Sequence, residues 1–181
     1  MARYILQSGI SWKVVENKWP GIEQAFLRFD PSLLNIQPDD FWHDLLNDGR
    51  VIRHGAKVNA IRKNAAFISE LAKEHGSAVG YLLGWPSTDL VGLFEFLARR
   101  GDRLGGSTGQ YVLRAIGKDN FVLSRDVVAC LKDAGVAITG DGSGKAERKA
   151  IQAAFNQWAE ETGPPMSHLS VIAAQSIDSG E

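Results

Sequence analysis

The glycine pair in Leu104-Gly105-Gly106 has the residue type and spacing of a backbone anion site. Glycine admits backbone conformations closed to other residues, and a helix that begins at such a turn leaves several amide N–H groups without acceptors. Ser107 is placed to cap this helix. Free amides and the positive end of the helix dipole together bind phosphate. A plain corner with a glycine stop is the alternative for this stretch alone.

About twenty residues after the glycine pair, the stretch Ser124-Arg-Asp126 contains a carboxylate. Asp126 has the chemistry to stabilise positive charge that develops on a sugar, or to position a water for attack on it. The alternative is a capping role, because an acid in the first turn of a helix is favoured by the helix dipole.

A tryptophan comes directly after a glycine turn near the start of the chain, in Gln7-Ser-Gly-Ile-Ser-Trp12. The indole of Trp12 has the shape of a stacking platform for a planar base. A core anchor is the alternative for an aromatic side chain of this size.

Other reactive side chains form no recognisable site. The single cysteine, Cys130, falls among apolar helix positions and is predicted to be an inert, buried thiol. The loop at residues 139–145 lacks the spacing of a phosphate-binding loop and is interpreted as a linker. The histidines have no metal-ligand spacing, so we expect neither a metal site nor a cofactor; they are His43, His54, His75 and His168.

The elements that must position these groups are all helical, because apolar residues recur at threes and fours along the chain. Residues 1–9 are predicted to form a helix, and Ser11 caps the next one. Pro20 is expected to open a further helix that Phe29-Asp-Pro31 ends. A long helix over residues 52–74 is expected to be a central strut. About nine or ten helices are predicted in total.

Two helices joined by the turn at the glycine pair are predicted to form a hairpin at about residues 99–117. Ser87 or Thr88 is expected to cap the helix before it, and Ser124 the helix after it. The C-terminal helices are expected over residues 145–176. Residues 1–176 are predicted to form one domain, with 177–181 as a frayed tail.

Composition is that of an ordinary soluble protein. The chain has 181 residues and a net charge of −1, which does not favour coating of nucleic acid by bulk attraction. It leaves room for a local basic face around the hairpin and in residues 50–63. One cysteine excludes an intrachain disulfide, so a reducing, cytoplasmic location is expected. No apolar run approaches the roughly 20 residues of a membrane span, and no secretory signal is visible.

Three ordered motifs resemble the 3-methyladenine DNA glycosylase I family. That family has Gln-Ala-Gly-Leu-Ser-Trp, Phe-Asp-Pro and Ile-Ile-Arg-x-x-x-Lys at similar intervals. Here the corresponding stretches are Gln7 to Trp12, Phe29-Asp-Pro31, and Val51-Ile-Arg-His54 with Lys57, followed by Asn64-Ala-Ala-Phe67. Residues 99–117 resemble the helix-hairpin-helix element that this family shares with other base-excision glycosylases. The likeness covers most of residues 1–120, and it implies an all-α, orthogonal helical domain.

The resemblance implies an enzyme that binds damaged duplex DNA, flips an alkylated adenine into a pocket and hydrolyses its N-glycosidic bond. Trp12 would stack on the extruded base, and Ile10 would wedge into the vacated duplex with Gln7 beside it. A cationic purine stacks well on tryptophan and is already a good leaving group, so little acid catalysis is required. The phosphate would be held at Gly105, Gly106, Ser107 and Thr108.

Several departures from the family accompany the resemblance. Tyr4 stands where the family has a glutamate that contacts the damaged base. The zinc-binding cysteines and histidines and the aromatic-rich N-terminal segment are absent. Two sources of replacement groups are open: residues upstream of Met1 in a longer gene product, or a remodelled subgroup of the family. In the wider glycosylase class a catalytic aspartate aligns with Ser124. Asp126 is offset by two residues, about 200° on a helix, and is the best candidate for the catalytic carboxylate.

The leading hypothesis is therefore a 3-methyladenine-type DNA glycosylase whose partner is double-stranded DNA containing alkylated bases. A catalytically weak or inactive DNA-binding, damage-recognition module is the alternative, because Tyr4 replaces the glutamate. A protein-interaction scaffold is a third. No membrane association and no protein partner are predicted.

Overall fold

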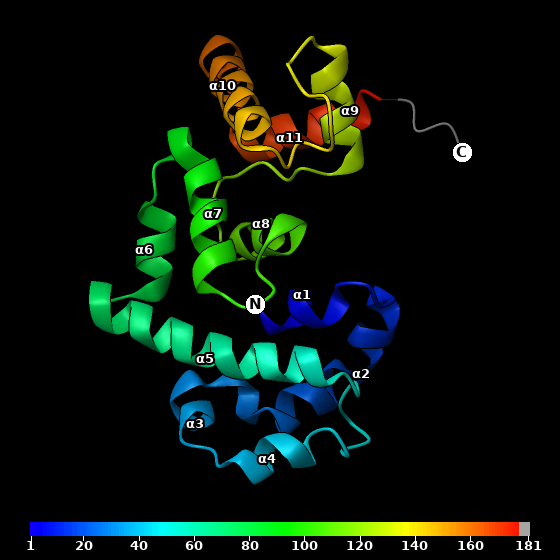
Figure 1. Ribbon diagram of the computed structural model, residues 1–181, viewed down its shortest axis with the longest axis vertical. Coiled ribbons are helices and arrows are strands. Elements are labelled where there is room, and N and C mark those ends of the chain that lie inside the picture. The colour runs from blue at the N-terminus through cyan, green and yellow to red at the C-terminus, as the bar shows by residue number, and fades with distance from the viewer. Residues whose placement is uncertain (178–181) are drawn as a thin grey trace.

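The long helix α5 (Gly55–His75) crosses the molecule with the helices of residues 12–44 on one side and those of residues 90–115 on the other (Figure 1). It contributes side chains to two buried apolar clusters. Ala60, Phe67 and Leu71 belong to the larger cluster, with Ile5 of the first helix and the helices that follow α5 in the chain. Val58 and Ile61 belong to the smaller cluster, with the helices that precede it. The predicted central strut is therefore confirmed, with bounds shifted by a few residues.

The computed structural model describes residues 1–177, and in this range it is all-α, with no strand. The predicted fold class is confirmed. Apart from residue 177, the predicted frayed tail lies outside the described residues. Besides α5, the α-helices are α1 (Ala2–Gln7), α2 (Trp12–Ala25), α3 (Pro31–Asn35), α4 (Asp39–Asp44), α6 (Ala78–Gly84), α7 (Leu90–Arg100), α8 (Gly106–Ala115), α9 (Arg125–Asp133), α10 (Lys145–Thr162) and α11 (Met166–Gln175).

Two short 3-10 helices, η1 (Leu27–Phe29) and η2 (Ser87–Asp89), complete the described part of the chain. The number of helices is slightly higher than predicted. The reason is that α3 and α6, with 5 and 7 residues, are too short to give a periodic apolar pattern.

The prediction that Pro20 opens a helix is wrong, because Pro20 lies inside α2. Buried side chains continue through it at helical spacing, with Val15 before it and Ile22 and Ala25 after it. A proline within a helix removes one backbone hydrogen bond. Pro20 and Glu16 are both exposed, so water can hydrogen-bond the carbonyl that is left without a partner.

The Phe29-Asp-Pro31 stretch ends one helix, as predicted, but it also begins another. Leu27, Arg28 and Phe29 all have φ between 52° and 56°, the left-handed region. This region costs a non-glycine residue about 1–2 kcal/mol. Stacking of Phe29 on Trp19, with centroids 5.3 Å apart, offsets part of that cost. Asp30 then accepts a hydrogen bond from the Ser32 amide and caps α3.

The capping residue before α7 also differs from the prediction. Asp89, and not Ser87 or Thr88, accepts the hydrogen bond from the Gly92 amide. Ser87 and Thr88 are instead part of η2. The predicted cap at Ser124 is confirmed, because its hydroxyl accepts from the Val127 amide at 3.2 Å.

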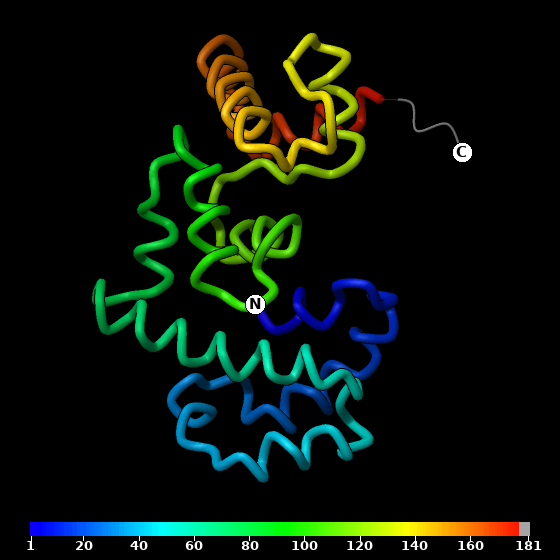
Figure 2. The backbone as a smooth tube through the Cα atoms, viewed as in Figure 1, coloured from blue at the N-terminus to red at the C-terminus, as the bar shows by residue number. Residues whose placement is uncertain are grey.

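The C-terminal helices α9, α10 and α11 lie together at one end of the molecule, as the tube in Figure 2 shows. Phe121 from the preceding connector stacks on Phe155 of α10 with ring centroids 4.3 Å apart. The linker before α10 is held by Glu147, which accepts hydrogen bonds from the amides of Thr139, Gly140 and Gly144. These amides lower the pKa of Glu147, so its hold on the linker is present at neutral pH and is lost as the pH falls through that lowered value.

None of the helices that the structure describes is long and apolar enough to cross a membrane.

Candidate functional site

The turn at residues 7–11, between α1 and α2, carries the Gln7-to-Trp12 motif. Gly9 has a φ of +71°, and the Ile10 amide donates to the Gln7 carbonyl at 3.0 Å, so the turn is tight. The ammonium of Lys57, from α5, donates to the carbonyls of Leu6 and Ser8 at 2.7 and 2.5 Å. The C-terminal end of α1 is thereby joined to the long helix.

Three aromatic side chains from three helices meet beside this turn; we call Tyr4, Trp12 and Tyr111 the aromatic cluster. The rings of Tyr4 and Tyr111 are parallel within 5°, with centroids 6.1 Å apart. Trp12 meets Tyr111 edge-on, also at 6.1 Å. Trp12 is 51% exposed, so the alternative of a core anchor does not fit. A large part of the indole is available to a planar ligand.

The turn at residues 101–105, between α7 and α8, is the hairpin corner. Asn64 of α5 pairs with the Asp102 backbone: its Nδ2 donates to the Asp102 carbonyl at 2.8 Å, and its Oδ1 accepts from the Asp102 amide at 3.1 Å. Lys63 adds an ion pair with the Asp102 carboxylate at 3.0 Å. Arg103 follows with a φ of 58° and an exposed side chain.

Helix α8 begins at Gly106, with Gly105 as its N-cap and no side-chain hydrogen bond at the cap. The prediction that Ser107 caps the helix is therefore wrong, because the helix starts one residue before it. The amides of Gly106, Ser107 and Thr108 belong to the first turn and have no intrahelical acceptor. Gly106 and Ser107 are exposed, and Thr108 is half-buried. Such a helix start favours an anion.

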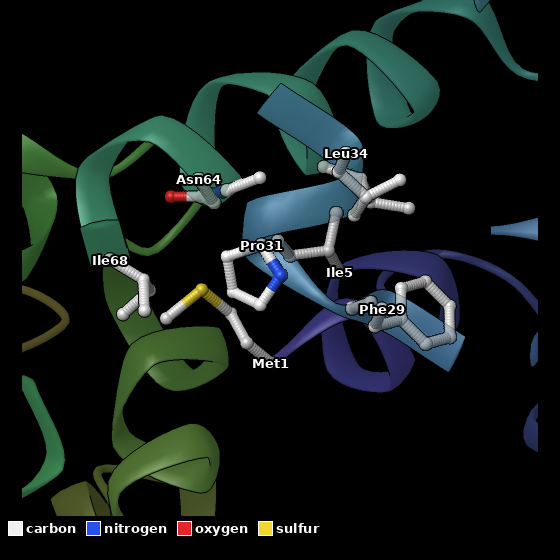
Figure 3. A pocket seen from close by; sticks show the side chains of 10 residues that line it. Met1, Ile5, Phe29, Pro31, Leu34, Asn64 and Ile68 are labelled. Carbon is white, nitrogen blue, oxygen red and sulfur yellow. The ribbon is translucent and has the colours of Figure 1, made fainter. Parts of the chain in front are cut away.

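Two adjoining cavities lie at the N-terminal end of α1. The smaller, of about 80 Å³, is lined by apolar side chains and Asn64; Figure 3 shows Met1, Pro31 and Ile68 around it. The larger, of about 460 Å³, has Tyr4 in its wall. Arg3, stacked over Trp19 at 4.4 Å, is the one charged side chain among the described residues that line the larger cavity.

Most of the basic residues near the hairpin and in residues 50–63 form ion pairs or are buried, so their charge is not free to attract DNA. Arg50, Arg62, Lys63 and Arg100 form ion pairs, and Lys57 and Lys118 are buried. The basic side chains that are exposed and form no ion pair with another described residue are Arg53, Arg99, Arg103 and Arg125. Local positive charge at the hairpin is thus supplied by Arg99 and Arg103.

Asp126 lies in the first turn of α9 and is half-exposed. No hydrogen bond or ion pair joins its side chain to another residue in the range 1–177. Figure 1 shows α8 between α1, which carries Tyr4, and α9, which carries Asp126. The structure does not bring Asp126 into contact with Trp12 or Tyr4.

The amino-acid sequence was compared with models of known protein families. The family model of methyladenine glycosylase matches residues 4–99, just over half of the chain. The chain belongs to the methyladenine glycosylase family. Membership supports a DNA glycosylase role in base excision repair and implies a DNA substrate. No solved structure matches the chain at a significant level.

The match to the methyladenine glycosylase model begins at Tyr4 and ends in α7. It therefore includes Trp12, Gln7 and Ile10, and it stops before the hairpin corner and Asp126. The roles in DNA binding and catalysis assigned to all of these residues stay predictions for this member of the methyladenine glycosylase family. Gln7 is only 4% exposed, and its Oε1 has no hydrogen-bond partner in the part of the chain that the structure describes. A DNA contact through Gln7 therefore requires the turn to move. Ile10 is half-buried against the smaller core cluster.

Three residues that belong to the aromatic cluster or contact the two turns are not among the site residues predicted from the sequence of this family member. Tyr111 joins Tyr4 to Trp12, and Lys57 and Asn64 hold the two turns. Lys57 and Asn64 do stand in the quoted motifs, which gives a signal of importance but none of the contact. Tyr111 has no signal beyond its place on the hairpin helix.

Changing Gly105 to alanine is expected to leave the free energy of unfolding nearly unchanged while weakening binding to duplex DNA about fivefold. Gly105 has an ordinary φ of −75°, and an added Cβ meets only the Ala98 Cβ, at 3.6 Å. The added methyl group does, however, stand where a phosphate would approach the first amides of α8. Fluorescence anisotropy with a labelled duplex measures the affinity. Unchanged affinity would contradict the predicted phosphate site.

Proposed function

We propose that this chain is a 3-methyladenine-type DNA glycosylase that hydrolyses the N-glycosidic bond of an alkylated adenine flipped out of duplex DNA. Trp12 stacks on the extruded base, and Tyr4 contacts it in place of the family's glutamate. Ile10, with Gln7 beside it, fills the vacated site in the duplex. The phosphate backbone binds at Gly105, Gly106, Ser107 and Thr108.

The observation that carries this proposal is that α8 has both a helix start with free amides and a side chain in the aromatic cluster. Its first turn presents free amides, and Tyr111, four residues after Ser107, packs on both Tyr4 and Trp12. Four residues of helix span about 6 Å, which is the scale of one nucleotide. A backbone phosphate at the start of α8 and a base on Trp12 can therefore belong to the same strand of DNA.

Stacking suits the substrate that the family name indicates. A 3-methylated adenine carries positive charge while it remains attached to the sugar, and a cation is attracted to the face of an aromatic ring. No carboxylate side chain is among the described residues that line the larger cavity beside Tyr4, and Arg3 is one of them. Binding must then come from the aromatic faces of Trp12 and Tyr4.

Release of free base from methylated duplex DNA tests the proposal. The wild-type chain should release 3-methyladenine at a rate that saturates with protein concentration, and its affinity for the duplex should fall steeply with salt. Tight, salt-dependent binding to an abasic-site duplex without any release would overturn the glycosylase proposal in favour of the non-catalytic damage-recognition module. The replacement of a base-contacting glutamate by Tyr4 is the observation that favours this second function.

Asp126 is proposed as the carboxylate that stabilises the positive sugar in the transition state. Asp126→Asn should slow base release about tenfold, because a unit charge a few ångströms away in a solvated site contributes about 1–2 kcal/mol. Single-turnover release at saturating protein measures this step separately from binding. Asp133→Asn, at the exposed end of the same helix, is the control and should change nothing. Equal rates for the Asp126→Asn and wild-type chains would remove Asp126 from the mechanism.

A further inference from the structure

Helix α5 carries two buried polar side chains on one face. Lys57 is 2% exposed and Asn64 is 3% exposed. Residues seven apart on an α-helix lie within about 20° of each other, and about 10 Å apart along the axis. Each of these side chains reaches out of the helix to the backbone of a different turn, the 7–11 turn for Lys57 and the 101–105 turn for Asn64.

The Lys57 ammonium is buried and forms no ion pair with a carboxylate of residues 1–177. Its hydrogen bonds go to the carbonyls of Leu6 and Ser8, which are at the C-terminal end of α1, where a positive charge is favoured. Burial, and then the nearby Arg103 guanidinium, lower the pKa of Lys57. Burying an ammonium opposes folding unless it is well hydrogen-bonded. An apolar side chain would fill the space at lower cost, so the hydrogen bonds to the turn are what Lys57 specifically supplies.

Asn64 is fully used in the same way. Its Nδ2 donates to the Ala60 and Asp102 carbonyls, both at 2.8 Å, and its Oδ1 accepts from the Asp102 amide. A side-chain amide that pairs with both polar groups of one residue fixes that residue in position and orientation. Asp102 is thereby held just before Arg103, whose left-handed backbone begins the approach to the glycine pair.

We propose that Lys57 and Asn64 are positioning residues that hold the base-reading turn at residues 7–11 and the phosphate-binding turn at residues 101–105 at a fixed separation along α5. The proposal rests on the proposed function, since it concerns the spacing between the site of base recognition and the site of phosphate binding. Neither side chain touches DNA. Both act through the backbone of the turn that they hold.

Lys118 provides a matched control. It is 6% exposed, and its ammonium also donates to two carbonyls at the end of a helix, those of Leu83 and Trp85. These carbonyls lie at the C-terminal end of α6, and the turn there belongs to neither predicted DNA contact. Lys118→Met therefore removes the same chemistry from a different place.

Base release and DNA affinity should separate the two positions. Lys57→Met is expected to slow single-turnover base release at saturating protein about tenfold, because a misplaced turn misorients the stacked base. Its Kd for undamaged duplex should stay within about twofold of wild type, since the phosphate site is untouched. Asn64→Ala should raise that Kd about tenfold, because a phosphate site that is no longer preorganised must be ordered on binding. Lys118→Met should change neither quantity.

Amide hydrogen exchange provides a readout that does not depend on catalysis. Lys57→Met should raise exchange in residues 7–11, Asn64→Ala in residues 101–105, and Lys118→Met in residues 84–89. Exchange that rises evenly over the chain in Lys57→Met or Asn64→Ala, or equal losses of rate and affinity in both variants, would overturn the proposal. If Lys57→Met does not fold, Lys57→Gln, which keeps one N–H donor group, is measured in the same way. A wild-type chain that releases no base refutes the proposed function. The exchange pattern still decides, independently of catalysis, whether Lys57 and Asn64 hold the two turns.

Discussion

Replacing Trp12 with alanine is expected to lower the rate of base release from alkylated duplex DNA about 100-fold, because stacking on an aromatic ring contributes about 1–3 kcal/mol per base. The free energy of unfolding should change little, since Trp12 is 51% exposed and its ring is nearly perpendicular to that of Tyr111, with centroids 6.1 Å apart. Single-turnover kinetics give the first quantity and urea denaturation the second. The two results together distinguish a recognition role from a structural one.

Two control variants sharpen the Trp12 experiment. Trp12→Phe retains a flat ring and should recover most of the lost rate. Ile36→Ala removes a large apolar side chain that is 75% exposed and belongs to the same N-terminal half, and it should leave release unchanged. A Trp12→Ala chain that releases base at the wild-type rate would refute the stacking role.

Gly109→Ala should destabilise the fold by about 3 kcal/mol or more, because overpacking a buried site against a rigid neighbour forces the backbone to shift. A Cβ at this position would lie 2.1 Å from the Leu104 carbonyl oxygen and 3.5 Å from the Leu97 side chain. The obstruction is backbone, so no side-chain rotation relieves it. Chemical denaturation measures the loss, and affinity for duplex DNA should fall with it because the 101–105 turn is displaced.

Gly106→Ala is the matched control for Gly109. A Cβ at Gly106 meets nothing within 4 Å, so the strain comes only from its φ of 57°. That strain is about 1–2 kcal/mol for a non-glycine residue. Equal destabilisation by the two substitutions would show that the close packing of Gly109 on Leu104 does not restrict the hairpin.

The strongly periodic helices are predictable from the sequence because each carries its apolar stripe over several turns. Helices α5 and α10 are found close to their predicted bounds for this reason. Local rules fail where tertiary packing overrides them. Pro20 is tolerated inside α2 because the apolar face continues past it, and the left-handed turn at residues 27–29 follows from aromatic packing that no local pattern announces.

The candidate site divides in the same manner. Trp12 and the glycine pair are visible in the sequence because each stands in a short contiguous motif. The packing of Tyr111 on Tyr4 and Trp12, and the hydrogen bonds of Lys57 and Asn64, join residues far apart in the chain. Contacts of that kind depend on how the helices pack, which a single sequence does not reveal.

The shared face of Lys57 and Asn64 restricts how this chain tolerates insertions and deletions. One residue added between them would rotate Asn64 by about 100° around α5 and turn it away from Asp102. It would also turn Phe67 and Leu71 away from the larger cluster to which both belong. The linker before α10 has no such constraint on its length. Length variation in natural variants of this chain should therefore gather in the linkers and be absent from the two helical turns between Lys57 and Asn64.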